Sequence, residues 1–344
     1  MSTQSHQPAA HEGPTWENCA QMAMSAMRLS GIWPADAEAP MLVVAKAPHT
    51  LAQKALAHPL ALPWIQTGAR MARRFFPSAR ASAPLLSAAH GQSGSALAIA
   101  EPGSLAMIIP QSWASGCHIE MRDAMGLRED HFRFVICAHE LGHLALAARK
   151  NPSQGMAETL VGAAGLPAPE QEAILKAIGP RHPDDGWAMI QSQWRSMLFE
   201  GLADSCAASA AAAAGLGPAK AFANAIATAR KAEMAAANEN LECFSEEGGR
   251  DHDTRSAMAR VAAREPGLQG ASGDLFADSA RMACLGLLDE MRACLANAPD
   301  SAGALLLVRQ GAFPKPRENQ PPLIDFSKRH RPAHAAAQPR GPQP

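Results

Sequence analysis

The sequence predicts an α+β protein that is predominantly helical and carries a small β-sheet. Hydrophobic residues make up 47% of the 344 residues, and much of that share is alanine. Large aromatic residues are few, with ten Phe, six Trp and no Tyr, and this balance favours helix over sheet. A convincing sheet signal is confined to residues 95–121, whereas helical periodicity dominates the chain that follows.

The N-terminal part is predicted to contain one helix and one short strand before this sheet region. Residues 16–29 carry apolar side chains at helical spacing, and Gly31 and Pro34 follow as stop signals. Residues 41–45 form a short apolar run that is compatible with a buried strand. Residues 49–80 have a helical pattern that three prolines interrupt.

The sheet signal itself predicts three strands. Residues 95–100 and 104–109 are two apolar runs that flank a turn at Glu101-Pro102-Gly103. Residues 117–121 alternate apolar with polar side chains, which predicts a third strand.

The rest of the chain predicts a series of helices. The first spans residues 130–150, with Asp130 as its N-cap and Asn151-Pro152 as its stop. The later ones are expected at residues 168–178, 187–214, 218–240, 254–264 and 274–296. Residues 1–14 are expected to be a flexible lead, and the Pro-rich tail over 314–344 is expected to be disordered.

Composition also bounds the partners and the compartment. The net charge is −1 and no basic block is present, which argues against nucleic acid as a partner. No stretch is apolar enough to predict a membrane span or a signal peptide. The seven cysteines are odd in number and show no CxxC spacing, so we expect reduced thiols and a cytoplasmic protein. We assign Cys137 and Cys206, near the candidate site, to core packing.

A metal-binding motif lies in the helix predicted over residues 130–150. His139 and His143 are four residues apart, so both imidazoles point from one helical face toward one ion. Glu140 is placed to take a proton from a water on the open side of that ion. Zinc suits this chemistry because it lowers the pKa of bound water to about 7. Gly142 leaves the helix face bare where a neighbouring segment packs or a ligand approaches.

The alternative to a metal site is an ordinary helix that happens to carry two histidines. Apolar residues surround the motif on nearly every side, so the helix is expected to be buried. Buried histidines and a buried glutamate are costly unless something satisfies them. We therefore predict one bound Zn²⁺ ion.

A catalytic zinc site takes three protein ligands and keeps one position open. Glu200 is the preferred third ligand because it lies in a strongly apolar helix, where an unpaired carboxylate is costly. Asp204, one turn later, is predicted to accept a hydrogen bond from the second nitrogen of a zinc histidine. Two solvated acids on one helical face are the alternative for this pair. Other possible ligands, with His182 first among them, are Glu158, His182, Asp184 and Asp185.

Hydrolysis also needs a group that stabilises negative charge on the carbonyl oxygen. The chain has no tyrosine, and we predict His252 for this role because it lies between two predicted helices, from where it can reach the site, and partly because of the family resemblance given below. Arg255 and Arg260 are alternatives, and each can instead pair with Asp204 or another buried acid. The same segment is also typical of a charged helix start, with Asp253 or Thr254 as N-cap.

The chain resembles the gluzincin metallopeptidases, and most of all the family of the CaaX prenyl proteases and bacterial heat-shock membrane proteases. Four features carry the likeness, in order: the strands around Pro102-Gly103, His139-Glu-Leu-Gly-His143, Glu200-Gly-Leu-Ala-Asp204 and His252-Asp-Thr-Arg255. Well-known members are embedded in membranes, so this chain would be a soluble relative. It also has Asp253 where the family has proline.

The resemblance implies a single zincin-like peptidase domain over residues 15–313, with its site within 95–265. It implies that His139, His143 and Glu200 bind zinc. It also implies that Glu140 is the general base, that Asp204 orients a ligand histidine and that His252 lies at the site. The upstream strand would form a sheet edge to which an extended peptide substrate adds through main-chain hydrogen bonds.

We expect a zinc-dependent endopeptidase that acts on a protein or peptide. A second hypothesis is a zinc-stabilised regulatory or interaction protein without turnover, in which His182 or Cys137 closes the fourth zinc position. A third hypothesis is a secreted peptidase effector that acts on a foreign target.

Overall fold

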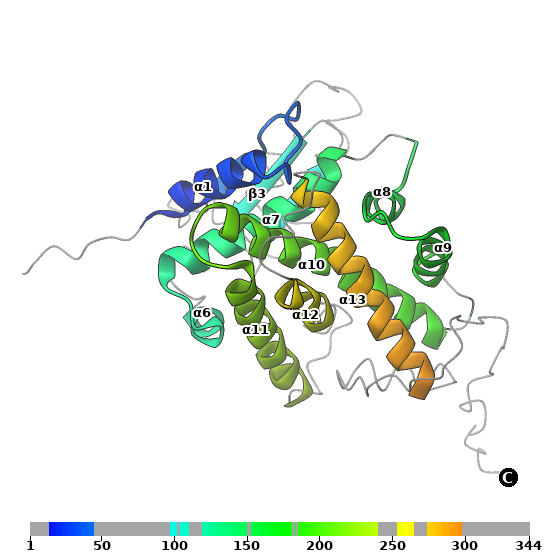
Figure 1. Ribbon diagram of the computed structural model, residues 1–344. Helices are drawn as coiled ribbons and strands as arrows, with labels where there is room; N and C mark the ends of the chain where they lie inside the picture. The colour runs from blue at the N-terminus through cyan, green and yellow to red at the C-terminus, as the bar shows by residue number, and fades with distance from the viewer. Residues whose placement is uncertain are drawn as a thin grey trace, which may run out of the picture.

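The computed structural model describes residues 14–44, 97–101, 104–109, 119–149, 153–180, 183, 185–239, 253–264 and 274–297. Helices dominate this part of the chain, and a small sheet lies against them (Figure 1). The prediction of a predominantly helical fold with a small sheet is confirmed. The elements in chain order are α1 (Trp16–Leu29), β1 (Met41–Val44), β2 (Leu97–Glu101), β3 (Ser104–Ile109), α6 (Ile119–Met125), α7 (Glu129–Arg149), α8 (Met156–Ala163), α9 (Ala168–Ala177), α10 (Asp185–Ala213), α11 (Ala219–Glu239), α12 (Arg255–Ala263) and α13 (Leu275–Asn297).

The sheet has the strand order β1-β3-β2. β2 and β3 pair antiparallel, as expected for two strands around a turn, and β1 pairs parallel to β3. β3 is therefore the central strand, and its two sides are already occupied. β1 and β2 lie at the two edges of the described sheet, so β3 has no free side for main-chain addition of a peptide.

The third predicted strand is wrong, because the chain from Ile119 to Met125 is helix α6. Met121 and Met125, four residues apart, both pack against the core. This helical period extends beyond the five-residue window in which the alternation resembled a strand. The third strand of the sheet is instead β1, from the apolar run at residues 41–45.

Most of the later helices agree with the predicted spans to within one or two residues. α7 begins one residue before the predicted N-cap, so Asp130 lies in its first turn, where its carboxylate binds Arg128. α8 was not predicted, and its eight residues are too few for a clear periodic signal.

Helix α7 is the central element of the fold. It contacts α1, α10, β2 and β3, and twelve of its residues are buried. Burial of this helix is predicted by the apolar residues that surround the HExxH motif in its sequence. Gly142 allows a close crossing with α10, because a Cβ at this position would lie 2.9 Å from Cα of Ala203. This crossing brings the part of α10 that follows Glu200 against the part of α7 that carries His139.

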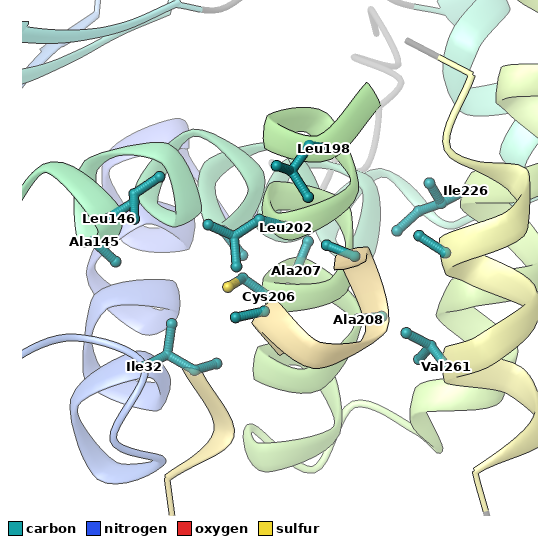
Figure 2. Close-up of a cluster of buried hydrophobic side chains, with 14 of the residues drawn as sticks. Ile32, Ala145, Leu146, Leu198, Leu202, Cys206, Ala207, Ala208, Ile226 and Val261 are labelled. Carbon is teal, nitrogen blue, oxygen red and sulfur yellow. The ribbon is translucent and has the colours of Figure 1, made fainter. Parts of the chain in front are cut away.

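One cluster of buried side chains connects the helices. Figure 2 shows part of it, where side chains of α10 meet those of α7, α11 and α12. The labelled members from these helices are Ala145, Leu146, Leu198, Leu202, Cys206, Ala207, Ala208, Ile226 and Val261. Many are alanines, so the helices pack closely, as the composition indicates.

Other predictions meet the structure only in part. No helix among the described residues is long and apolar enough to cross a membrane. Five cysteines of the described chain are buried free thiols, including Cys137 and Cys206. The N-terminal lead up to residue 13, the helical pattern at 49–80 and the tail at 314–344 lie outside the described residues.

Glu290 on α13 is a buried carboxyl that is expected to make a pH-dependent contribution to stability. The residue is 3% exposed, and Oε2 has no hydrogen-bond partner among the described residues. Burial raises the pKa of this carboxyl to about 9, and nearby Asp253 acts in the same direction. Since the unfolded chain releases this proton near its ordinary pKa of 4.5, the folded state binds more protons between these values. The contribution of Glu290 to the free energy of unfolding therefore falls as pH rises from about 4.5 to about 9.

We expect Glu290→Gln to remove this dependence, because the amide keeps the shape of a neutral carboxyl. The stability difference in favour of the variant should grow by about 1.4 kcal/mol per pH unit between pH 5 and pH 8. Urea unfolding of both proteins at several pH values measures it. The half-exposed Glu170 provides the control Glu170→Gln, and parallel curves for Glu290→Gln and the native protein would contradict the assignment.

Candidate metal centre

Two histidines of α7 and one glutamate of α10 converge on a common point. Nε2 of His139 and Nε2 of His143 are 3.3 Å apart. Oε2 of Glu200 lies 3.3 Å from Nε2 of His139, and Oε1 lies 3.3 Å from Nε2 of His143. The three side chains are partly buried and form a group that can hold a metal ion.

The spacing of these atoms fits a small tetrahedral ion. Ligand atoms at 2.0–2.1 Å from a tetrahedral centre are separated by about 3.3–3.4 Å. The two histidine Nε2 atoms have this separation, and each oxygen of Glu200 lies 3.3 Å from one of them, so the group is compact enough to hold such an ion. Imidazole nitrogen with carboxylate oxygen is a donor set that suits zinc, copper, iron or nickel better than calcium or magnesium.

Asp204 is hydrogen-bonded to the ring nitrogen of His139 that faces away from the metal position. Its Oδ1 is 2.7 Å from Nδ1 of His139, so the imidazole can donate from Nδ1 while Nε2 faces the metal position. Burial disfavours the charged imidazolium, but Asp204 and Glu200 outweigh it and raise the pKa of His139 to about 10 in the metal-free protein. A bound metal ion therefore displaces a proton from this ring.

The carboxylate of Glu200 is kept ionised by its neighbours. Burial alone would raise its pKa, but the charges and hydrogen bonds of His143 and His139 hold that pKa well below the ordinary range. An ionised Glu200 is the form that a metal ion requires.

Glu140 is buried beside the ligands, at 7% exposure. Burial raises the pKa of its carboxyl, and the charges of His139 and His143 only partly offset this. Glu200 also acts on it electrostatically, as expected for a carboxyl close to the ligand group. A carboxyl whose pKa lies above its ordinary value accepts protons more readily, which suits a general base.

Two residues at this centre are absent from the sequence-based prediction. Arg230 of α11 contacts both acids of α10, with Nη2 at 3.6 Å from Oε2 of Glu200 and Nε at 3.1 Å from Oδ2 of Asp204. Thr254, before α12, places its Oγ1 2.6 Å from Oδ2 of Asp204. The only sequence signal for Arg230 is an arginine in an otherwise Ala-rich helix, and Thr254 was considered only as an N-cap.

The two arginines considered for stabilising the oxyanion form ion pairs away from the metal ligands. Arg255 forms a two-point ion pair with buried Asp253, and Arg260 forms one with Asp289. Arg255 thus pairs with a buried acid, as the sequence allowed. His252, the residue preferred for the oxyanion role, lies outside the described residues.

The other possible ligands do not join the group within the described chain. Glu158 is exposed on α8, whereas His182, Asp184 and the side chain of Asp185 lie outside the described residues. Sγ of Cys137 is directed to the carbonyl oxygen of Trp16, at 3.9 Å, on α1. Within the described residues, the metal-binding group therefore consists of three protein ligands.

Comparisons with models of known protein families, with curated proteins and with solved structures find no significant match. The resemblance to gluzincins stays a prediction from the sequence.

Proposed function

We propose that the protein is a zinc-dependent metallopeptidase of the gluzincin type, with a zincin-like catalytic domain. One observation carries the proposal: a buried glutamate, Glu140, lies beside a group of three metal ligands that no fourth ligand from the described chain completes. A structural zinc site is closed by four protein ligands, whereas a catalytic site keeps one position for water or substrate. Three ligands beside a buried glutamate form the arrangement that zinc-dependent hydrolysis uses, and this supports the proposal.

The residues of the chain have separable roles in this proposal. His139, His143 and Glu200 hold the ion, and Asp204 fixes the tautomer of His139. Zinc, when bound there, supplies a Lewis acid that makes water more acidic and polarises the scissile carbonyl.

Glu140 takes the proton of the attacking water and then delivers it to the leaving amine. The oxyanion role of His252 stays a prediction, as does the cytoplasmic location.

A peptide library tests the proposal directly. We expect the zinc-loaded protein to cleave internal peptide bonds in a proteome-derived library, with the products read by mass spectrometry. A zinc chelator should abolish cleavage, and added Zn²⁺ should restore it, since ligands and base are otherwise unchanged. Cleavage that persists without the metal, or a zinc-loaded protein that cleaves nothing, would refute the peptidase assignment.

A further inference from the structure

The carboxylate of Asp204 accepts four hydrogen bonds at the metal centre. Its Oδ1 accepts hydrogen bonds from Nδ1 of His139 at 2.7 Å and from Nη2 of Arg230 at 3.1 Å. Its Oδ2 accepts from Nε of Arg230 at 3.1 Å and from Oγ1 of Thr254 at 2.6 Å. Each carboxylate oxygen accepts about two hydrogen bonds, so these three partners use the full capacity of the group.

The three partners come from different parts of the fold. His139 lies on α7, Arg230 on α11 and Thr254 at the start of α12, while Asp204 itself lies on α10. The side chains of Asp204 and Arg230 are 4% and 11% exposed, so little water competes for these bonds. Nε and Nη2 of Arg230 each donate a hydrogen bond to one oxygen of Asp204, and this two-point contact restrains rotation of the carboxylate.

Thr254 has a hydroxyl that is committed to this contact. It is the N-cap residue of α12, but its side chain makes no capping hydrogen bond within the described chain. The bond to Asp204, at 2.6 Å, instead links the start of α12 to the partner of His139.

Arg230 also balances the negative charge of the metal centre. Glu140, Glu200 and Asp204 bring three carboxylates to one partly buried site. A divalent ion supplies two of the positive charges that match them, and the guanidinium of Arg230 supplies the third. Buried charges are tolerated when they are matched in this way.

We propose that Arg230 and Thr254 are positioning residues of the metal centre, which hold the ligand His139 in place through Asp204. The proposal rests on the metal centre described under the proposed function and extends it by two residues. Neither residue is assigned a role in bond cleavage. With Asp204 immobilised by both, Nδ1 of His139 stays directed to the carboxylate and Nε2 stays directed to the ion.

Two substitutions isolate positioning from charge. Thr254→Val keeps the size of the side chain and removes only the hydroxyl that binds Asp204. Arg230→Lys keeps the positive charge near the ion and removes the two-point hydrogen bonding to Asp204. Removing the charge, as in Arg230→Met, would also relieve its repulsion of a divalent cation, so that variant would mix two opposing effects.

We expect each variant to bind zinc about tenfold more weakly than the native protein, as competition with a chelator measures it. The Nδ1 proton of His139 in the zinc-loaded protein should also exchange faster with water, as read by NMR. The matched controls are Thr228→Val, whose hydroxyl binds the helix backbone, and Arg264→Lys, whose partner is Asp278. Both controls should keep the native zinc affinity and the native proton exchange.

Zinc affinity within about twofold of native for both Thr254→Val and Arg230→Lys would overturn the proposal. A loss equal to that of the controls would overturn it too, because it would reflect general destabilisation. Both readouts are independent of hydrolysis, so a native protein that binds zinc without cleaving peptides refutes the proposed function alone. A native protein that binds no zinc refutes both.

Discussion

Glu140→Gln should keep its zinc and lose peptide hydrolysis. The amide has the shape of the carboxyl but cannot take a proton from water, so kcat should fall by about 10²–10⁴-fold. His139, His143 and Glu200 are untouched by the change, so zinc content should equal that of the native protein. Parallel measurements of zinc per chain and of peptide cleavage on the same samples check both parts of the prediction.

The control for this substitution is Glu170→Gln on α9, which replaces a half-exposed glutamate that pairs with Arg292. It should leave both cleavage and zinc content unchanged. Native activity in Glu140→Gln would show that another group is the base. Loss of zinc from this variant would instead place Glu140 among the ligands.

Removing Glu200 should deprive the protein of its metal ion. Glu200→Ala leaves only the two histidines of α7, and two donors hold a divalent ion far less well than three. Groups that merely orient a ligand contribute about 10–100-fold to metal affinity, so the loss of a direct ligand should exceed about 100-fold. Dialysis followed by elemental analysis should then find zinc in the native protein and almost none in the variant.

The matched control is Glu158→Ala, which removes an exposed acid on α8 that the sequence left open as a rival ligand. This variant should keep its zinc. Retention of zinc by Glu200→Ala would show that the third ligand lies elsewhere, and loss from Glu158→Ala would identify it.

The ligand group is predictable from the sequence because burying its polar and charged side chains costs free energy unless they have partners. An apolar helix that carries His139, Glu140 and His143, and a second one that carries Glu200 and Asp204, each need an internal partner. A single ion with a hydrogen-bonded carboxylate would satisfy both helices at once. Local sequence therefore specifies the chemistry of the centre, and the close crossing at Gly142 supplies the geometry.

The residues that the sequence did not reveal belong to the contacts between helices. Arg230 lies in a helix without a motif, and its side chain is assigned only when α11 packs beside α10. Thr254 looks like a helix cap from its position, and only the fold shows that Asp204 takes its hydroxyl. The predicted strand at residues 117–121 fails for a similar reason, because the five-residue window omits the helical face that Met121 and Met125 form.

The measurement that tests the central claim most directly is X-ray absorption at the zinc edge of the purified native protein, together with its metal content. We expect one zinc per chain, bound only by nitrogen and oxygen at about 2.0–2.2 Å, with histidine scattering and one ligand from solvent. A sulfur ligand at about 2.3 Å would indicate a closed structural site. Iron in place of zinc, or a native protein that carries no metal at all, would contradict the assignment of His139, His143 and Glu200 as a catalytic zinc centre.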